Sequence, residues 1–281
     1  MKGMKRSYFP LLLTFLLLNG CQKDRVTIPS DTSVAANPTQ IQTQTLQPNR
    51  ISIALEQLPQ PFASDSASKP PEILPIPAQA KLNVPQGFQV NVFAENLDNP
   101  RWLALTPDGD VLVTETRQNR IRLLKDTDKN GVADSYKTFA TAENGLDLPF
   151  GMAFSGNSFF LGNQDGVLRF PFSKGQESIS GTGQKIAELP GGGYRQHWTR
   201  NVVASPDGQK LYISIGSRSN VDVEELPRAS VQEMDLKDYR LSTFASGLRN
   251  PVGLDFHPVT GELYTSVNER DGLGDDLVPD Y

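Results

Sequence analysis

The residues best suited to chemistry lie in one glycine-rich stretch, residues 191–201, which contains one of the two histidines of the chain. Three consecutive glycines precede His197 in this stretch, and Arg200 and Asn201 follow it. Imidazole changes its charge near neutral pH and can therefore accept a proton, while arginine and asparagine donate hydrogen bonds to anionic oxygens. The stretch predicts a catalytic base beside an anion-binding group, with a purely structural histidine as the alternative.

A second arginine–asparagine pair, Arg249 and Asn250, occupies the equivalent place in a later copy of the same sequence pattern. Two such pairs at matching positions favour a shared anionic ligand, and a simple surface charge is the alternative for Arg249. The other histidine, His257, lies between Phe256 and Pro258 and is interpreted as a structural turn residue.

Two acidic segments suit a hard cation such as Ca²⁺. The first has the spacing D-x-D-x-N-G-x-x-D, in which alternate side chains supply oxygens and a glycine permits a sharp turn. Its expected ligands are Asp126, Asp128, Asn130 and Asp134. Because Lys137 replaces the final glutamate of an EF-hand loop and no helical pattern flanks the segment, we expect a structural calcium site in a strand hairpin. The second segment, residues 268–276, combines carboxylates with glycines, and a solvated acidic loop is its alternative.

The composition excludes several classes of function. With 27 Lys and Arg against 32 Asp and Glu, and a net charge of -5, no basic stripe is available for a nucleic-acid partner. The chain has no phosphate-binding glycine loop, no G-x-S-x-G elbow, no H-E-x-x-H motif and no paired histidines for zinc. Its single cysteine excludes an internal disulfide and a cysteine-based metal site.

The first residues have the form of a bacterial export signal. A basic start precedes the apolar run Phe9–Leu18, which is too short to cross a bilayer, since crossing takes about 20 residues. Leu18-Asn19-Gly20-Cys21 resembles the lipoprotein box, which implies that residues 1–20 are removed and that Cys21 carries the lipid. We expect an exported protein that is lipid-anchored to a bacterial membrane and faces the periplasm or the cell exterior, with an unlipidated secreted protein as the alternative. Residues 21–80, rich in Ser, Thr, Pro and Gln, are expected to form a disordered tether.

From residue 81 onward, one pattern of short strands and turns recurs. Each copy has an apolar strand, a turn that resembles Pro-Asp-Gly, and a second strand. The equivalent strand ends are Leu105, Phe154, Ala204 and Phe256. A period of about 50 residues built from short strands is typical of β-propeller blades, so residues 81–281 are predicted to be an all-β propeller with about four blade repeats. Loops from all blades meet at the mouth of a propeller, where we expect His197 and Arg249.

Four motifs follow one another along the predicted propeller. They are the run from Gly193 to Asn220, which contains His197 and ends in Gly216-Ser217-Arg218-Ser219-Asn220, together with Glu143-Asn144-Gly145-Leu146, Gly247-Leu248-Arg249-Asn250-Pro251 and Asn268-Glu269-Arg270-Asp271. In these motifs the chain resembles the soluble quinoprotein glucose/sorbosone dehydrogenases, and the sorbosone-type and aldose-type members more than the glucose enzyme. That family is a six-bladed propeller that holds pyrroloquinoline quinone (PQQ) and Ca²⁺ over its mouth, so the resemblance implies the same fold and cofactors.

The resemblance also implies roles for individual residues. His197 would be the general base that takes the proton of a sugar hydroxyl while a hydride passes to the quinone, and Arg249 would contact and polarise that quinone. The other residues implied at PQQ are Glu143, Arg200, Asn201 and Asn250. Glu269 and Arg270 match positions that give the calcium its backbone ligands, and Gln196 stands where the glucose enzyme has an acidic residue before the base.

We interpret the chain as a PQQ-dependent dehydrogenase that oxidises a sugar, either an aldose or a sorbosone-like compound, with the natural electron acceptor unassigned. Two alternatives stay open: a non-enzymatic cell-surface propeller that binds a sugar or a protein, and a calcium-dependent propeller lactonase. Because the family has six blades and about four repeats are found here, we expect a C-terminally truncated propeller, which could be an inactive fragment.

Overall fold

The computed structural model describes residues 32–33, 40–50, 52, 54–57, 72–75, 77–193 and 197–272. The predicted signal segment, Cys21, Gln196, Asp275 and Asp276 lie outside these residues. None of the helices in the described part of the chain has the length and the apolar character needed to cross a membrane.

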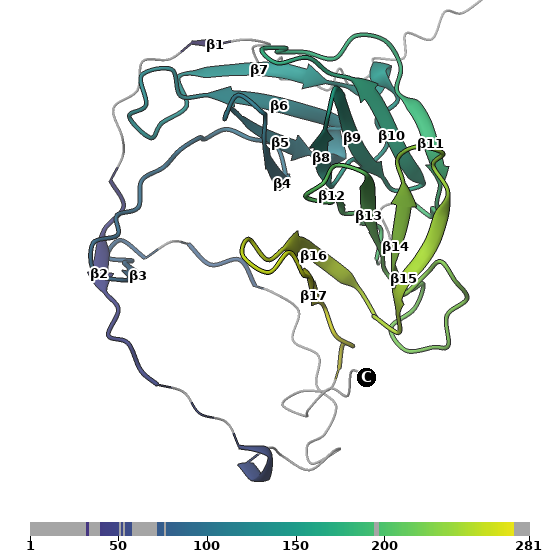
Figure 1. Ribbon diagram of the computed structural model, residues 1–281. Helices are drawn as coiled ribbons and strands as arrows, with labels where there is room; N and C mark the ends of the chain where they lie inside the picture. The colour runs from purple at the N-terminus through teal and green to yellow at the C-terminus, as the bar shows by residue number, and fades with distance from the viewer. Residues whose placement is uncertain are drawn as a thin grey trace, which may run out of the picture.

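Four antiparallel sheets are arranged radially around a common centre as propeller blades, and we call this open arrangement the fan (Figure 1). Blade 1 consists of β4 (Pro100–Leu105), β5 (Val111–Glu115), β6 (Arg120–Lys125) and β7 (Ser135–Ala140). Blade 2 consists of β8 (Met152–Ser155), β9 (Ser158–Asn163), β10 (Gly166–Pro171) and β11 (Gln184–Glu188). Blade 3 consists of β12 (Val202–Ala204), β13 (Lys210–Ile215), β14 (Ser230–Asp235) and β15 (Leu241–Ser246). The described strands of blade 4 are β16 (Pro251–Phe256) and β17 (Leu263–Val267).

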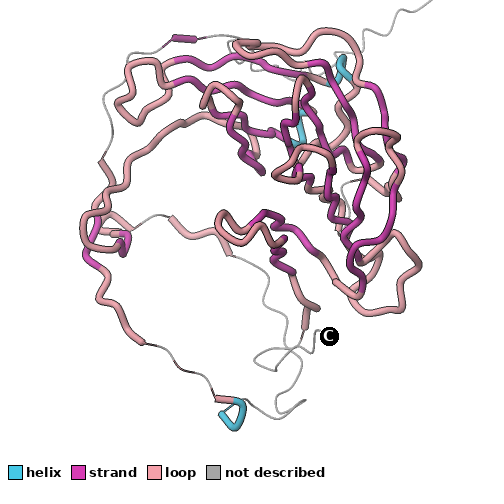
Figure 2. Tube along the Cα trace, in the orientation of Figure 1, coloured by secondary structure: helices cyan, strands magenta, loops and turns pink. Residues whose placement is uncertain are grey.

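Helical structure is confined to three short 3-10 turns within the described residues (Figure 2). They are η1 (Leu55–Gln57), η2 (Thr116–Gln118) and η3 (Ala142–Asn144). The predicted all-β propeller class is therefore confirmed.

The first strand of each blade lies nearest the centre of the fan. β4 contacts β8, β8 contacts β12, and β12 contacts β16. The predicted strand ends fall within or at the end of these inner strands: Leu105, Phe154, Ala204 and Phe256. The sequence period thus corresponds to one blade, as predicted.

Tight turns join the first two strands of a blade because their glycines accept a left-handed backbone. Gly109 has φ 89° and donates its N–H to the carbonyl of Thr106 at 2.9 Å. The equivalent Gly208 of blade 3 has φ 70° and donates to Ser205 at 2.8 Å. Glycine adopts this conformation without the steric penalty of a Cβ atom, so the Pro-Asp-Gly sequences form hairpins.

The apolar core lies between neighbouring blades. Phe139 of blade 1 is fully buried against Phe159 of blade 2, with ring centroids 5.4 Å apart in an edge-to-face arrangement. A second cluster between blades 2 and 3 contains the fully buried Leu211 and Ile213. Burial of one such side chain contributes roughly 1.5–3 kcal/mol to folding. Each blade therefore depends on its neighbour for stability.

Consecutive strands within a blade are antiparallel, so their connections alternate between the two ends of the fan. We call one end the mouth face: it holds the connections between blades and those between the second and third strands of a blade. We call the other end the turn face: it holds the tight hairpins and the β6–β7 connection. His197 precedes β12 and Arg249 precedes β16 on the mouth face, whereas residues 126–134 join β6 to β7 on the turn face.

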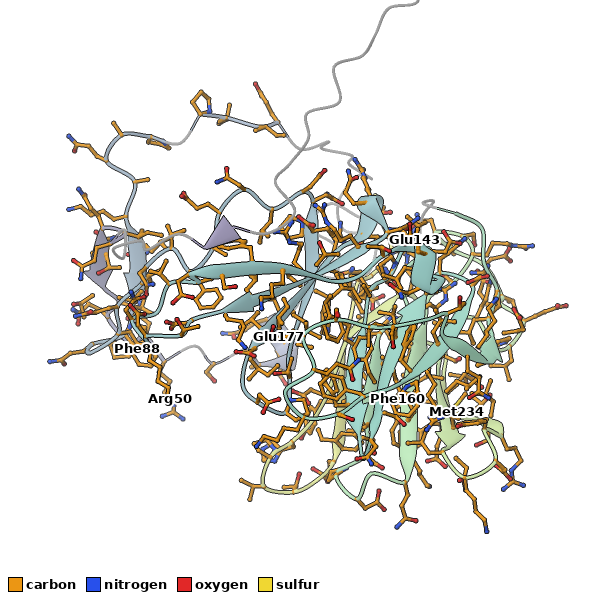
Figure 3. The ribbon with its side chains drawn as sticks, turned by 90° about the horizontal axis from the view of Figure 1, so that it is seen from above. Arg50, Phe88, Glu143, Phe160, Glu177 and Met234 are labelled. Atoms are coloured by element: carbon orange, nitrogen blue, oxygen red, sulfur yellow. The ribbon has the colours of Figure 1, made fainter. Side chains whose placement is uncertain are left out.

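Parts of the predicted tether pair with other strands. β1 (Thr32–Ser33) adds antiparallel to β7 at the outer edge of blade 1, and β2 (Thr43–Thr45) pairs parallel with β3 (Leu82–Val84). The β2–β3 pair lies away from the blades, on the side where Figure 3 labels Arg50 and Phe88. The division into tether and propeller at residue 81 stays a prediction.

Candidate functional site

His197 is held against a different connection of the mouth face. Its Nδ1 lies 2.9 Å from the carbonyl oxygen of Ser217 and 2.8 Å from the Oγ of the same residue. Ser217 belongs to the β13–β14 connection of blade 3. The other ring nitrogen, Nε2, makes no hydrogen bond within the described residues, so the imidazole is anchored at one nitrogen and free at the other.

Gly216 allows this group to form. A Cβ atom at Gly216 would lie 2.5 Å from the Cβ of His197 and 2.5 Å from the Oδ1 of Asn250, closer than any real side chain tolerates. The predicted pair of His197 and Asn250 is thus brought together on the two sides of one glycine. Asn250 is 8% exposed, and its Oδ1 is buried without a hydrogen-bond partner in the described structure. An unpaired buried acceptor is unusual in a folded protein and calls for an explanation such as a bound water, an ion or strain.

The guanidinium of Arg249 forms hydrogen bonds with several connections of the mouth face. Nε and Nη2 donate to Asn220, at 3.0 Å to its carbonyl and at 2.6 Å to its side-chain oxygen. Nη2 also pairs with Asp271 at 3.0 Å, and Nη1 donates to the carbonyls of Asn268 and Glu269. The predicted contact of Arg249 with a quinone would require this guanidinium to share its hydrogen-bond donors with these oxygens.

Arg200 is buried and holds the backbone of the site in place. Its side chain is only 1% exposed, and Nη1 donates to the carbonyls of His197 at 2.9 Å and Thr199 at 2.7 Å. Nη2 donates to the carbonyl of Pro190 at 2.5 Å. Burial, together with the positive charge of Arg228, lowers the pKa of Arg200 to about 10, so the group stays charged at neutral pH. Arg200 therefore fixes the backbone that carries His197.

Asn201 joins two blades. It is 1% exposed, its Nδ2 donates to the carbonyl of Val252 at 2.9 Å, and its Oδ1 accepts the N–H of Val202 at 2.9 Å. Both ends of the amide are occupied by the protein. Asn201 follows Arg200 and is buried because its side chain connects blade 3 to blade 4.

A hollow of about 360 Å³ opens beside His197, and we call it the arginine hollow. It is lined by Gln164, Gly191, Gly192, Gly193, His197, Trp198, Arg200, Ser217, Arg218 and Arg228. Among the described residues, three arginines and no carboxylate line it, so its electrostatic character favours an anion. A second hollow, of about 500 Å³, shares Ser217 and Arg228 with it and extends to Arg249 and Arg270.

The ionisation of His197 suits proton acceptance. Burial lowers the pKa of His197 most strongly, and the positive charge of Arg249 lowers it further. The backbone hydrogen bond to Ser217 and the charges of Asp271 and Glu224 act in the opposite direction without reversing the shift. The ring is consequently neutral at neutral pH, the state that can take up a proton.

Glu143 does not join this group. It is exposed in η3, whose Asn144 donates to the carbonyl of Gly181 at 2.8 Å and accepts the N–H of Gly183 at 3.0 Å. These glycines precede β11, the outermost strand of blade 2. Glu143, labelled in Figure 3, is therefore held towards the outer edge of the fan, and no contact supports its predicted place at a cofactor.

The acidic loop on the turn face forms the predicted hairpin, but its carboxylates bond to their own backbone. Asp126 accepts the N–H groups of Asn130 at 3.0 Å and Gly131 at 2.9 Å, and Asp128 accepts the Asn130 side chain at 2.9 Å. Asp134 accepts the N–H of Thr127 at 3.1 Å. Across the described residues, no three acidic, histidine or cysteine side chains converge as a metal site. The loop is also bonded from outside, by the Asn91 side chain at the carbonyl of Gly131, and the calcium site stays a prediction.

Sequence reasoning missed several residues of the site. Ser217, Arg218 and Asn220 belong to a motif that was recognised, but no role was assigned to them. Arg228 and Gln164 line the arginine hollow or contact its glycines without belonging to any recognised motif. Arg228 follows Glu224 and Glu225 in the sequence, so no local pattern marked it as part of an anion site.

Comparisons with known proteins give a consistent picture. The family model described as TrAA12-like matches residues 82–278. An uncharacterized protein of Borreliella burgdorferi is 29% identical over 208 residues, which cover 71% of this chain and 52% of that protein. The holo form of the pyranose dehydrogenase PQQ domain from Coprinopsis cinerea has a TM-score of 0.51 at 20% identity, covering 62% of this chain and 45% of that one. The calcium structure of the family AA12 carbohydrate-active enzyme from Trichoderma reesei has a TM-score of 0.52 at 19% identity, covering 64% and 48%.

The likeness to these two solved structures concerns the propeller fold. The chain spans about half the length of the relatives that it matches.

Proposed function

Because the chain belongs to the TrAA12-like family, we propose that it is a PQQ-dependent dehydrogenase that oxidises a sugar at the mouth face of its propeller. The observation that carries the proposal is the pairing of His197, neutral and free at Nε2, with a hollow lined by three arginines. The Coprinopsis cinerea domain of the same fold is described as a PQQ domain of a pyranose dehydrogenase, which supports this cofactor and a sugar substrate.

The residues present fit PQQ. PQQ is a polycarboxylate with an ortho-quinone, so it needs positive charge and hydrogen-bond donors. Arg218 and Arg228 line the arginine hollow and would neutralise its carboxylates, with Arg200 below them. The unpartnered atom of Asn250 does not add to this fit, because its buried Oδ1 accepts hydrogen bonds and the carboxylate and quinone oxygens of PQQ have none to donate.

Glu269 and Arg270, the residues implied as calcium ligands, fit a calcium ion less well than the arginine hollow fits PQQ. The carbonyl of Glu269, implied as a backbone ligand, accepts a hydrogen bond from the Arg249 guanidinium. Arg270, the second implied ligand, lines the neighbouring hollow, and its Nε is buried without a partner in the described residues. A positive guanidinium next to the predicted ligands opposes a second cation by charge repulsion. We therefore derive no catalytic step from calcium.

The chemistry at the site is a paired removal of a proton and a hydride. When bound, PQQ supplies an electrophilic carbonyl that accepts a hydride from the sugar carbon. Nε2 of His197 takes the proton of the hydroxyl on that carbon, and the carbon–oxygen bond becomes a carbonyl. A positioned base of this kind contributes about 10²–10⁴-fold to the rate. Arg200 holds the backbone of His197 and so keeps the base in place.

The arginines of both hollows weigh against the lactonase alternative. That activity needs carboxylates and asparagines around one central Ca²⁺. The described lining of the arginine hollow contains no carboxylate, and the carboxylates of the neighbouring hollow, Asp222, Glu224 and Glu269, share its wall with Arg228, Arg249 and Arg270. A binding propeller without catalysis would need no neutral histidine with a free nitrogen beside an anion site.

We also propose that the protein is exported and lipid-anchored to a bacterial membrane through Cys21. The support is the sequence of the export signal and the lipoprotein box alone. Mass spectrometry of the mature N-terminus tests this: diacylglycerol on Cys21 is expected, and an unmodified or retained N-terminus would contradict it.

The function is tested by supplying PQQ to the purified protein and following reduction of an artificial dye with a panel of aldoses. We expect His197→Gln to lower kcat by about 10²–10⁴-fold, because the proton acceptor is removed. His257→Gln is the matched control, since His257 lies on the turn face, and it should keep wild-type activity. A wild-type protein that neither binds PQQ nor reduces dye with any sugar would overturn the proposal.

A further inference from the structure

The structure assigns to Ser217 the role of fixing the proton of neutral His197 on Nδ1, which leaves Nε2 as the proton acceptor. Ser217 is a positioning residue in this account, because it acts through His197. The catalytic consequence rests on the proposed function, whereas the position of the proton does not.

The assignment follows from what each atom around Nδ1 can do. The carbonyl oxygen of Ser217, 2.9 Å from Nδ1, can only accept a hydrogen bond, so Nδ1 must carry the hydrogen. The Oγ of Ser217, 2.8 Å from Nδ1, has a single hydrogen, which it donates to the carbonyl of Ser219 at 2.7 Å. Oγ therefore also faces Nδ1 as an acceptor. Two independent acceptors require the same tautomer.

The serine is itself held in place from two sides. Its backbone N–H donates to the carbonyl of Arg249 at 2.7 Å, which ties it to the connection before blade 4. The Oε1 of Glu224 accepts the backbone N–H groups of Arg218 at 2.6 Å and Ser219 at 3.1 Å. The acceptors for Nδ1 thus have a fixed position that does not depend on a bound ligand.

A neutral hydrogen-bond partner at Nδ1 affects the pKa of His197 differently from a charged partner. No carboxylate forms a hydrogen bond with His197 in the described structure, and residues of both charges face it only at longer range: Arg249, Asp271 and Glu224. A carboxylate at Nδ1 would raise the pKa of His197 more strongly than the backbone hydrogen bond to Ser217 does, and the smaller upward effect of Ser217 does not outweigh the lowering by burial. His197 is therefore oriented and still neutral.

The second histidine provides an internal reference with the opposite tautomer. Nδ1 of His257 accepts the backbone N–H of Thr260 at 3.0 Å and that of Val259 at 3.3 Å. Because backbone N–H groups can only donate, Nδ1 of His257 is unprotonated and the hydrogen lies on Nε2. With only two histidines in the chain, the two signals can be assigned by one substitution.

The proton positions are measured by ¹⁵N–¹H multiple-bond correlation on the full chain, labelled with ¹⁵N-histidine, made without a histidine tag and held at mildly alkaline pH. We expect the Nδ1–H tautomer for His197 and the Nε2–H tautomer for His257, with His257→Gln used to assign the signals. The Nε2–H tautomer at His197 would overturn the assignment.

A charge substitution tests the contact itself. Ser217→Asp places a carboxylate on Nδ1, so the pKa of His197 measured by the same spectra should rise by about one unit or more. Ser219→Asp adds the same charge nearby without facing Nδ1 and should raise it by less than half as much. Equal shifts in the two variants would contradict a specific contact, and an unchanged His257 signal reports that both variants fold.

The two proposals fail separately. If His197 has the Nδ1–H tautomer and no sugar is oxidised, the proposed function falls and the role of Ser217 in setting the tautomer stands. If sugar is oxidised and His197 has the Nε2–H tautomer, the role of Ser217 falls. In an active protein, the fall of kcat/KM at low pH should begin at a higher pH in Ser217→Asp than in wild type. The size of this shift should equal the rise in the pKa of His197 measured by NMR, and KM should change little.

Discussion

In two hairpins of the turn face, aspartate side chains bond to the backbone of their own loop, whereas around His197 on the mouth face polar side chains bond to other connections. Asp126 accepts two N–H groups within its own hairpin, and Asp207 accepts the N–H of Gln209 two residues away at 3.0 Å. On the mouth face, His197 bonds to Ser217, and Arg249 reaches residues on both neighbouring connections. These two hairpins are held by local bonds, while the group around His197 depends on the assembled fan; elsewhere on the turn face, bonds such as Gly175 N–H to Asp108 at 2.6 Å also join blades.

This difference predicts that equivalent substitutions have unequal effects at the two faces. A change in the group around His197 disturbs several connections at once, whereas a change at a turn-face position without bonds between blades stays local.

The strongest contrast compares two glycines of blade 2. Gly162→Ala, near the mouth-face end of β9, would put a Cβ atom 2.2 Å from the carbonyl oxygen of Arg200 in blade 3. Because this neighbour is backbone, we expect the free energy of unfolding to fall by about 3 kcal/mol. Gly156→Ala, in the turn after β8, meets nothing within 4 Å and should cost about 1 kcal/mol through its φ of +53°. Urea unfolding of the two variants measures both, and equal losses would contradict the contrast.

The second contrast compares two arginines. Arg200→Met leaves the carbonyls of His197, Thr199 and Pro190 without their donor, so the free energy of unfolding should fall by about 2 kcal/mol. Arg240→Met, an exposed position of the turn face, should stay within about 0.5 kcal/mol of wild type. Thermal and urea unfolding check the pair. A loss at Arg200 no larger than that at Arg240 would show that the buried guanidinium is not a support.

The smallest expected effect is a pH dependence of stability. The pKa of His197 is lowered in the folded protein, so below its ordinary value of 6.5 the unfolded chain takes up a proton that the folded chain resists. The stability that neutral His197 provides is complete above that value and falls as the pH drops below it. Between about pH 7.5 and 5.5, wild type should lose more stability than His197→Gln. Parallel losses in urea unfolding at the two pH values would contradict the lowered pKa.

The difference between local and long-range contacts explains how much of the structure could be predicted from the sequence. Strands and hairpins were predictable because their signals are local: alternating apolar residues and Pro-Asp-Gly turns repeat with the blades. The inner strand ends at Leu105 and Phe256 were placed correctly for this reason.

The site was predictable only in part, because its contacts are long-range. His197 and Asn250 were identified by type and position, but the bond to Ser217 spans 20 residues and leaves no local pattern. Arg200 and Asn201 were expected at a cofactor, yet the same donors also satisfy buried backbone carbonyls, and the structure uses them in that way. Likewise, the spacing from Asp126 to Asp134 suits a calcium loop and a loop closed on its own N–H groups equally well.

The central claim, that the mouth face binds the anionic cofactor, is tested most directly by calorimetric titration of the protein with PQQ. We compare one substitution at both faces: Arg228→Gln in the arginine hollow and Arg240→Gln on the turn face. Loss of one charge-assisted contact should weaken PQQ binding by about tenfold in Arg228→Gln, while Arg240→Gln binds as wild type does. Equal affinities in the two variants, or no saturable binding by wild type, would contradict the claim.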